Sequence, residues 1–133
     1  MKAENELQQA IAANPQKPEG WGRLGGFYNS QGRYDDAFRQ FKRFAELDPQ
    51  NPRPLAGQGD ALAGKGNHKE AAEKYLAALA IDKTFSGAIY SLAQSYEKQE
   101  LKHRAKETYQ WFLTVEPKGA RAENAEKKIK ELN

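Results

Sequence analysis

The sequence repeats itself with a period of 34 residues along almost its whole length. A period of this size is typical of stacked helical or strand units, in which each unit buries its apolar face against its neighbours. Four columns of equivalent residues describe the second helix of each unit and the break that follows it: Ala3, Ala37, Ala71 and Ala105; Leu7, Phe41, Tyr75 and Tyr109; Ala10, Phe44, Ala78 and Phe112; Pro15, Pro49, Lys83 and Pro117.

A second set of columns describes the first helix of each unit. Their spacing of i, i+3, i+4 and i+7 is one face of an α-helix. The columns are Trp21, Leu55 and Ile89; Leu24, Gln58 and Leu92; Gly25, Gly59 and Ala93; Tyr28, Leu62 and Tyr96. The small residues of the third column predict that two helices approach closely there. Gly32 and Gly66 are expected to end first helices in the left-handed conformation, with second helices starting at Tyr34 and His68.

These columns resemble the signature of the tetratricopeptide repeat family. The unit 18–51 carries it most fully, in Trp21, Leu24, Gly25, Tyr28, Ala37, Phe41 and Pro49. The unit 52–85 departs at Gln58 and Lys83, and the unit 86–119 has Ala93 for glycine and Glu100 where a turn glycine is usual. The resemblance implies an all-α, right-handed superhelix of antiparallel helix pairs, whose first helices line a concave face.

The two ends of the chain depart from the full unit. Residues 2–14 keep the register of a second helix whose first helix is missing, so the chain is either part of a longer array or begins with a natural cap. Incomplete cover of Leu7 and Ile11 would then allow self-association through this end of the stack. Residues 120–132 place Ala122, Ala125, Ile129 and Leu132 on one stripe of an otherwise charged helix, and we interpret this as the capping helix.

Composition excludes several classes of protein. The hydrophobic fraction of 38% is low for a compact globule and suits a thin solenoid, and no apolar run is long enough to span a membrane. The absence of cysteine excludes disulfides and thiolate sites but leaves cytoplasm and periplasm equally open. A net charge of +3 with interspersed signs argues against nucleic-acid binding.

No arrangement of residues predicts catalysis. His68 and His103 have no partners at the spacing that a metal or a general base requires. Asp35 and Asp36 open a helix, where the helix dipole accounts for them. We therefore expect no enzyme activity, no catalytic residues, no metal and no cofactor.

The resemblance places candidate partner-binding residues between the packing columns of the first helices: Arg23, Gly26, Asn29, Arg53, Gly57, Asp60, Tyr90 and Gln94. Glycine within a helix costs about 1 kcal/mol relative to alanine, and Gly22, Gly26 and Gly57 lie outside the repeat signature. One hypothesis is that they make room for a partner at the groove floor, with the polar residues as anchors; the alternative is drift. Positions that form a chaperone-tail carboxylate clamp in one family subtype hold Gly22, Gly26, Gly57, Gly87 and Ser91, which argues against Hsp70 or Hsp90 tail binding.

The leading prediction is a non-catalytic scaffold that binds a peptide or helix of a protein partner, in the style of bacterial repeats. One alternative is a regulatory or localisation module of a larger enzyme or assembly. Another arises from the stretch 7–34, with Asn14-Pro15 and Pro18-Glu19-Gly20-Trp21, which is similar to the repeat subunits of bacterial cytochrome c maturation. That resemblance implies a periplasmic role in holding apocytochrome.

Overall fold

The computed structural model describes residues 2–133 and contains eight α-helices, with no strand in that part of the chain. In chain order they are α1 (Lys2–Ala13), α2 (Pro18–Ser30), α3 (Tyr34–Leu47), α4 (Arg53–Gly64), α5 (His68–Ile81), α6 (Ser86–Lys98), α7 (Lys102–Val115) and α8 (Ala120–Glu131). The all-α fold expected from the repeat is confirmed, and each predicted unit holds one helix pair.

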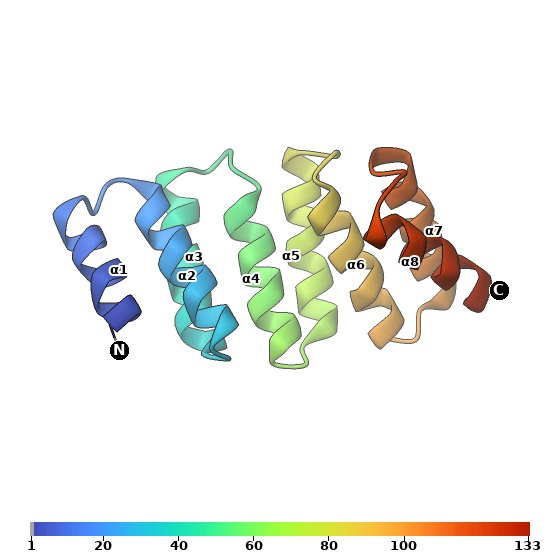
Figure 1. Ribbon diagram of the computed structural model, residues 1–133, viewed down its shortest axis with the longest axis horizontal. Coiled ribbons are helices and arrows are strands. Elements are labelled where there is room, and N and C mark those ends of the chain that lie inside the picture. The colour runs from blue at the N-terminus through green and yellow to red at the C-terminus, as the bar shows by residue number, and fades with distance from the viewer. Residues whose placement is uncertain (1) are drawn as a thin grey trace.

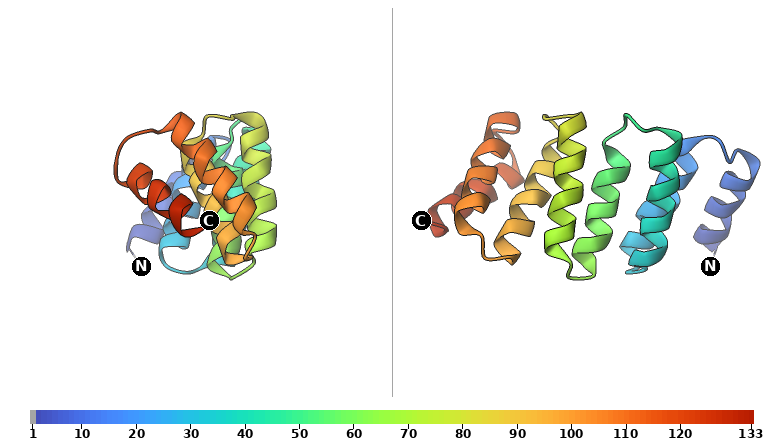
Figure 2. Two further views of the ribbon diagram at one scale, coloured as in Figure 1. Left: turned by 90° about the vertical axis from the view of Figure 1, so that its right-hand side faces the viewer. Right: turned by 180° about the vertical axis from the view of Figure 1, so that it is seen from behind.

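The helices form an elongated solenoid with the two chain ends at its opposite extremes (Figure 1). Each helix packs chiefly on its neighbours in the chain. In addition, α2 contacts α4, and α4 contacts α6. The first helices α2, α4 and α6 therefore make one layer, and the second helices α3, α5 and α7 make the other (Figure 2). We refer to the outer surface of α2, α4 and α6 as the first-helix face.

The turns inside the three pairs share one backbone geometry. Gly32 and Gly66 have φ values of 75° and 87°, which is the left-handed region that glycine enters without steric cost. Glu100 takes the same place in the third pair with φ 60°. In that turn the Leu101 amide donates to the Tyr96 carbonyl at 2.9 Å, and the other two turns have the same bond. The helix-ending role predicted for both glycines is confirmed.

The core consists of two clusters along the solenoid, one around α1–α3 and one from α4 to α8. In the three full units the predicted alanine column is buried at the layer boundary, since Ala37, Ala71 and Ala105 have no exposed surface, whereas Ala3 of α1 is exposed. A Cβ at Gly25 would lie 2.8 Å from the Phe41 ring, and one at Gly59 would lie 2.6 Å from the Tyr75 ring. The close approach predicted at these small residues is therefore confirmed.

The ends of the stack are held differently. At the start, the α1 side chain Ile11 is buried against α2 and Leu7 is half-buried, so the apolar edge considered for self-association is small. At the other end, Ala122 and Ala125 are buried while the charged side of α8 is exposed. None of the helices in residues 2–133 combines the length and the apolar character that crossing a bilayer requires.

Candidate functional site

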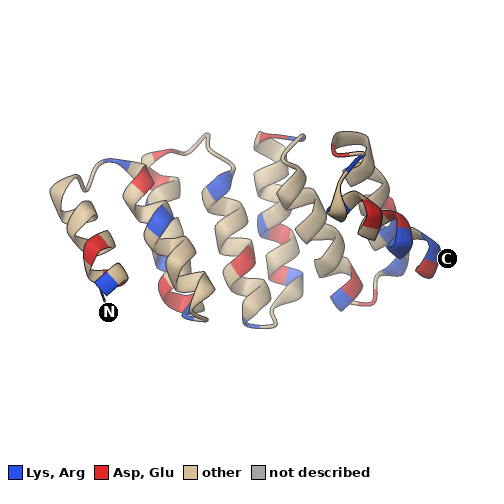
Figure 3. Cartoon of the chain, viewed as in Figure 1, with Lys and Arg blue, Asp and Glu red and all other residues tan. Residues whose placement is uncertain are grey.

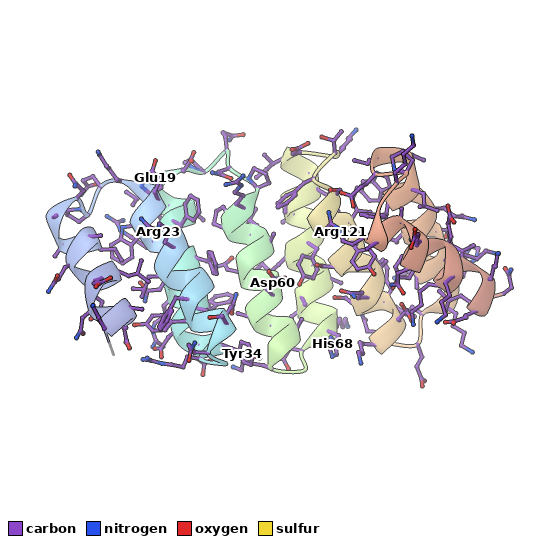
Figure 4. The ribbon with its side chains drawn as sticks, viewed as in Figure 1. Glu19, Arg23, Tyr34, Asp60, His68 and Arg121 are labelled. Carbon is purple, nitrogen blue, oxygen red and sulfur yellow. The ribbon has the colours of Figure 1, made fainter. Side chains whose placement is uncertain are left out.

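Two clefts open on the first-helix face. The first, of about 520 Å³, lies between the amino-terminal halves of α2 and α4, and its lining includes Gly22, Arg23, Phe41, Phe44, Asp48 and Arg53. The second, of about 490 Å³, extends from α4 across α6 to α8, and its lining includes Tyr75, Ser91, Gln94, Glu97, Asn124 and Lys128. Figure 4 places Arg23 on α2 and Asp60 on α4, which together mark the course of this face.

Five of the eight residues expected to bind a partner are exposed: Arg23, Gly26, Arg53, Asp60 and Gln94. Arg23 and Arg53 line the first cleft, and no carboxylate of residues 2–133 lies within ion-pair distance of either guanidinium group. Gln94 lines the second cleft. Basic and acidic residues are interspersed along the solenoid as a whole (Figure 3), so these two arginines stand out by lying together at one cleft.

The structure corrects the explanation offered for two of the glycines. A Cβ at Gly57 would lie 2.6 Å from three carbons of the Phe41 ring, and one at Gly22 would lie 2.7 Å from the Phe44 ring. Both positions are therefore glycine because aromatic side chains of α3 fill the space, and not because they leave room for a partner. Gly26 has nothing within 4 Å of its Cβ position, so only this glycine is left without a packing role.

Gly64, the last residue of α4, also has a packing role, because the Tyr34 ring lies against it. Two further candidates, Tyr90 and Asn29, are engaged inside the solenoid. The Tyr90 hydroxyl accepts a hydrogen bond from the Asn124 amide of α8, and the Asn29 amide donates to the Gly57 carbonyl at 3.2 Å. The structure therefore shows Tyr90 in a packing role, with its hydroxyl already bonded to α8.

Tyrosines from the second helices reach carboxylates near the second cleft. The Tyr75 hydroxyl donates to the Asp60 carboxylate at 2.6 Å, and the Tyr109 hydroxyl donates to the Glu97 carboxylate. Asp60 is open to solvent along the face, but neighbouring helices crowd its carboxylate, and this burial raises its pKa despite the opposing hydrogen bond. Burial also raises the pKa of Tyr75 and of Tyr109, so both remain protonated donors.

The sequence did not single out Glu97, Asn124 or Lys128 as part of a site. Lys128 of α8 lies 3.5 Å from Glu97 of α6, so α8 forms one wall of the second cleft. The repeat pattern could have indicated Glu97, which lies between the packing columns of the third unit, but it gave no reason to include α8. Asn124 and Lys128 of α8 line the cleft because α8 continues the first-helix layer.

The residues with possible catalytic roles are dispersed. His103 is exposed and lies 3.1 Å from Glu107 one helical turn later, while His68 is half-buried at the start of α5. Within residues 2–133, no group of three or more His, Cys, Asp or Glu side chains is placed to hold a metal ion. Asp35 pairs with Lys65 at 2.6 Å, which ties α3 to the end of α4.

Comparison with known proteins identifies the repeat. A family model described as tetratricopeptide repeat matches residues 1–52 and 30–84. The chain belongs to the tetratricopeptide repeat family. Repeats of this family are generally protein-interaction modules without catalytic activity, and the eight-helix solenoid agrees with that membership.

Curated relatives with similar repeats come from cytochrome c biogenesis. The chain is 36% identical over 105 residues to the cytochrome c-type biogenesis protein CycH of Rhizobium meliloti, covering 77% of this chain. It is 39% identical over 67 residues to CycH of Pseudomonas aeruginosa, covering 50% of this chain. The similarity thus extends well beyond residues 7–34. The matched repeats span only 26% and 16% of the lengths of those two relatives.

A solved structure supports the repeat fold independently. The first repeat domain of Spaghetti (RPAP3), bound to an HSP90 peptide, superposes with a TM-score of 0.80 at 24% identity, covering 87% of this chain and 92% of that one. At this level of identity the likeness establishes the tetratricopeptide fold alone.

Proposed function

We propose that this chain is a non-catalytic scaffold that holds an extended or helical segment of a protein partner along the first-helix face. The observation that carries the proposal is that two clefts of similar size open on one face, with Arg23 and Arg53 unpaired at the rim of the first. Charged side chains left without a partner on a hollowed surface are suited to bind a complementary segment.

The peptide bound to the repeat domain of Spaghetti (RPAP3) supports peptide binding as a function of this fold, but it does not identify the ligand of this chain. The positions expected to form a chaperone-tail clamp hold glycines or serine in this chain, and Gly22 and Gly57 cannot take longer side chains without displacing aromatic rings. The proposed partner therefore differs from a chaperone tail.

The test compares two double substitutions that change the net charge equally. Arg23→Glu with Arg53→Glu reverses the charge on the first-helix face, and Lys42→Glu with Lys69→Glu reverses two exposed lysines on the second helices. Proteins captured from an extract of the source cells by the unaltered chain are quantified against both variants. We expect the arginine variant alone to lose them; equal retention by both variants refutes the proposal.

A second, narrower function is favoured by the similarity to CycH over 77% of the chain. We propose that the captured segment belongs to a haem-free cytochrome c polypeptide, in line with the biogenesis role stated in the names of those relatives. The measurement is binding of the chain to purified apocytochrome c and to the same protein with haem attached. Selective binding of the haem-free form supports this assignment, and indifference to both forms removes it while leaving the general scaffold untouched.

A further inference from the structure

The central helix α4 is deeply buried but contributes few large apolar side chains to the core. Apart from Pro54 in its first turn, its buried residues are Ala56, Gly57, Gln58, Gly59 and Ala61. Its two leucines, Leu55 and Leu62, are only half-buried. The equivalent helix of the next pair, α6, buries Ile89 and Leu92 with 0% and 1% exposure. Because helices in proteins are stabilised mainly by packing of their apolar face, α4 is held less firmly than α6 by its own side chains.

The composition of α4 also disfavours a helix. Its 12 residues include Gly57, Gly59 and Gly64, and each glycine inside a helix is unfavourable relative to alanine. The 13 residues of α6 include one glycine, Gly87, in the first turn. A Cβ at any of the three glycines of α4 would overlap an aromatic ring of α3 or α5. The neighbouring helices therefore supply the packing volume here, and α4 supplies mainly backbone.

The apolar core is interrupted at the same helix. Leu24 of α2 belongs to the first cluster and Leu92 of α6 to the second, at equivalent positions of the repeat. The residue between them in this column is Gln58, which is 4% exposed and belongs to neither cluster. Of the buried residues of α4, only Ala61 joins the first cluster and only Ala56 joins the second. The core thus consists of one apolar body in α1–α3 and another in α5–α8.

The position of α4 makes it part of both clefts. It stands in the middle of the solenoid, between the pair α2–α3 and the pair α5–α6 (Figure 1). Arg53 at its start lines the first cleft, and Ala63 near its end lines the second. A displacement of this one helix therefore changes the shape of both clefts.

We propose that α4 is the compliant helix of this solenoid, which loosens locally while the cores of α1–α3 and α5–α8 stay intact and so lets the two clefts move relative to each other. Local opening of this kind occurs in elements that have few buried apolar contacts. The inference goes beyond the proposed scaffold function. Its test needs no partner, so its failure is distinguishable from failure of that function.

Amide hydrogen exchange of the unaltered chain compares α4 with α6. We expect the best-protected amides of α4 to have protection factors at least about tenfold below those of α6. Gln58→Leu supplies the leucine that the other two units have in this column, and it should raise the protection of α4. Gln110→Leu, on the exposed side of α7, should leave the protection of α4 unchanged. Equal protection of α4 and α6 in the unaltered chain would overturn the proposal.

Distances between spin labels measure the movement itself. The chain has no cysteine, so labels attach only where cysteine is introduced. Lys42, Leu76 and Gln110 are exposed at equivalent positions of α3, α5 and α7, so cysteines at 42 and 76 span α4, and cysteines at 76 and 110 span α6. We expect a broader distance distribution for the pair 42/76 than for the pair 76/110. Equal widths, or a broader distribution for the pair 76/110, would overturn the proposal.

Discussion

Replacing Gly57 by alanine should destabilise the solenoid, whereas the same change at Gly26 should stabilise it. Both glycines lie inside helices, so alanine would gain about 1 kcal/mol of helix propensity at either position. At Gly26 the new methyl group meets no atom within 4 Å, so this gain is realised in full.

At Gly57 the propensity gain is opposed by overpacking. The added Cβ would lie 2.6 Å from the Phe41 ring, and the ring is held from its other side by Gly25, whose Cβ position is 2.8 Å away. The buried ring is therefore confined between the Gly25 and Gly57 positions. Overpacking of a buried core costs roughly 1–3 kcal/mol, which after the propensity gain leaves a net loss of up to about 2 kcal/mol.

Urea unfolding followed by far-UV circular dichroism measures the difference. We expect Gly26→Ala to raise the midpoint and Gly57→Ala to lower it, with an unchanged slope, because neither change alters the surface exposed on unfolding appreciably. In thermal unfolding the same 1 kcal/mol corresponds to a shift of roughly 4 °C. If Gly57→Ala is as stable as Gly26→Ala, the packing explanation of the groove glycines is wrong.

Three further predictions follow from local features. Glu100→Gly should raise the free energy of unfolding by about 0.5–1 kcal/mol in urea titrations, since it relieves a left-handed residue with φ 60°; a loss of stability would show that the Glu100 side chain has another role. Glu4 accepts hydrogen bonds from Tyr28 and Arg33, both at 2.8 Å, and these bonds lower its pKa below the ordinary value of 4.5. Because the pKa of Glu4 is lower in the folded state than in the unfolded state, its ionised carboxylate stabilises the fold at pH values above the unfolded-state pKa, and this stabilisation is lost as the pH falls through the folded-state pKa. Glu4→Gln should therefore lower the free energy of unfolding at pH 7 and change it little at pH 3; a cost independent of pH would contradict this. Sedimentation velocity tests the self-association considered for the α1 end: because Ile11 is buried and Leu7 is half-buried there, we expect a sedimentation coefficient that does not rise with concentration, and a rise would contradict this.

The sequence predicted the layers of this fold well because its signal is repeated. Each column combines several independent occurrences, so one departure such as Glu100 or Gln58 does not obscure the period. The turn in the third pair keeps the geometry of the other two without glycine, because the flanking helices impose the left-handed residue.

The candidate site was harder to predict, because it depends on contacts between columns. The repeat pattern of a single unit gives no reason for Gly22 or Gly57. Only the structure shows the ring of Phe44 against Gly22 and the ring of Phe41 against Gly57. Side-chain direction, rather than helix placement, was the missing information.

The central claim is that a partner lies on the first-helix face, and photo-crosslinking from two matched positions tests it most directly. A benzophenone amino acid is introduced in place of Gly26, which is exposed on this face with open space around it, or in place of Leu76, which is 44% exposed on α5 of the opposite layer. Irradiation of the source cells should yield a discrete protein adduct from position 26 and none from position 76. Adducts from position 76 alone, or the same adducts from both positions, would contradict the account.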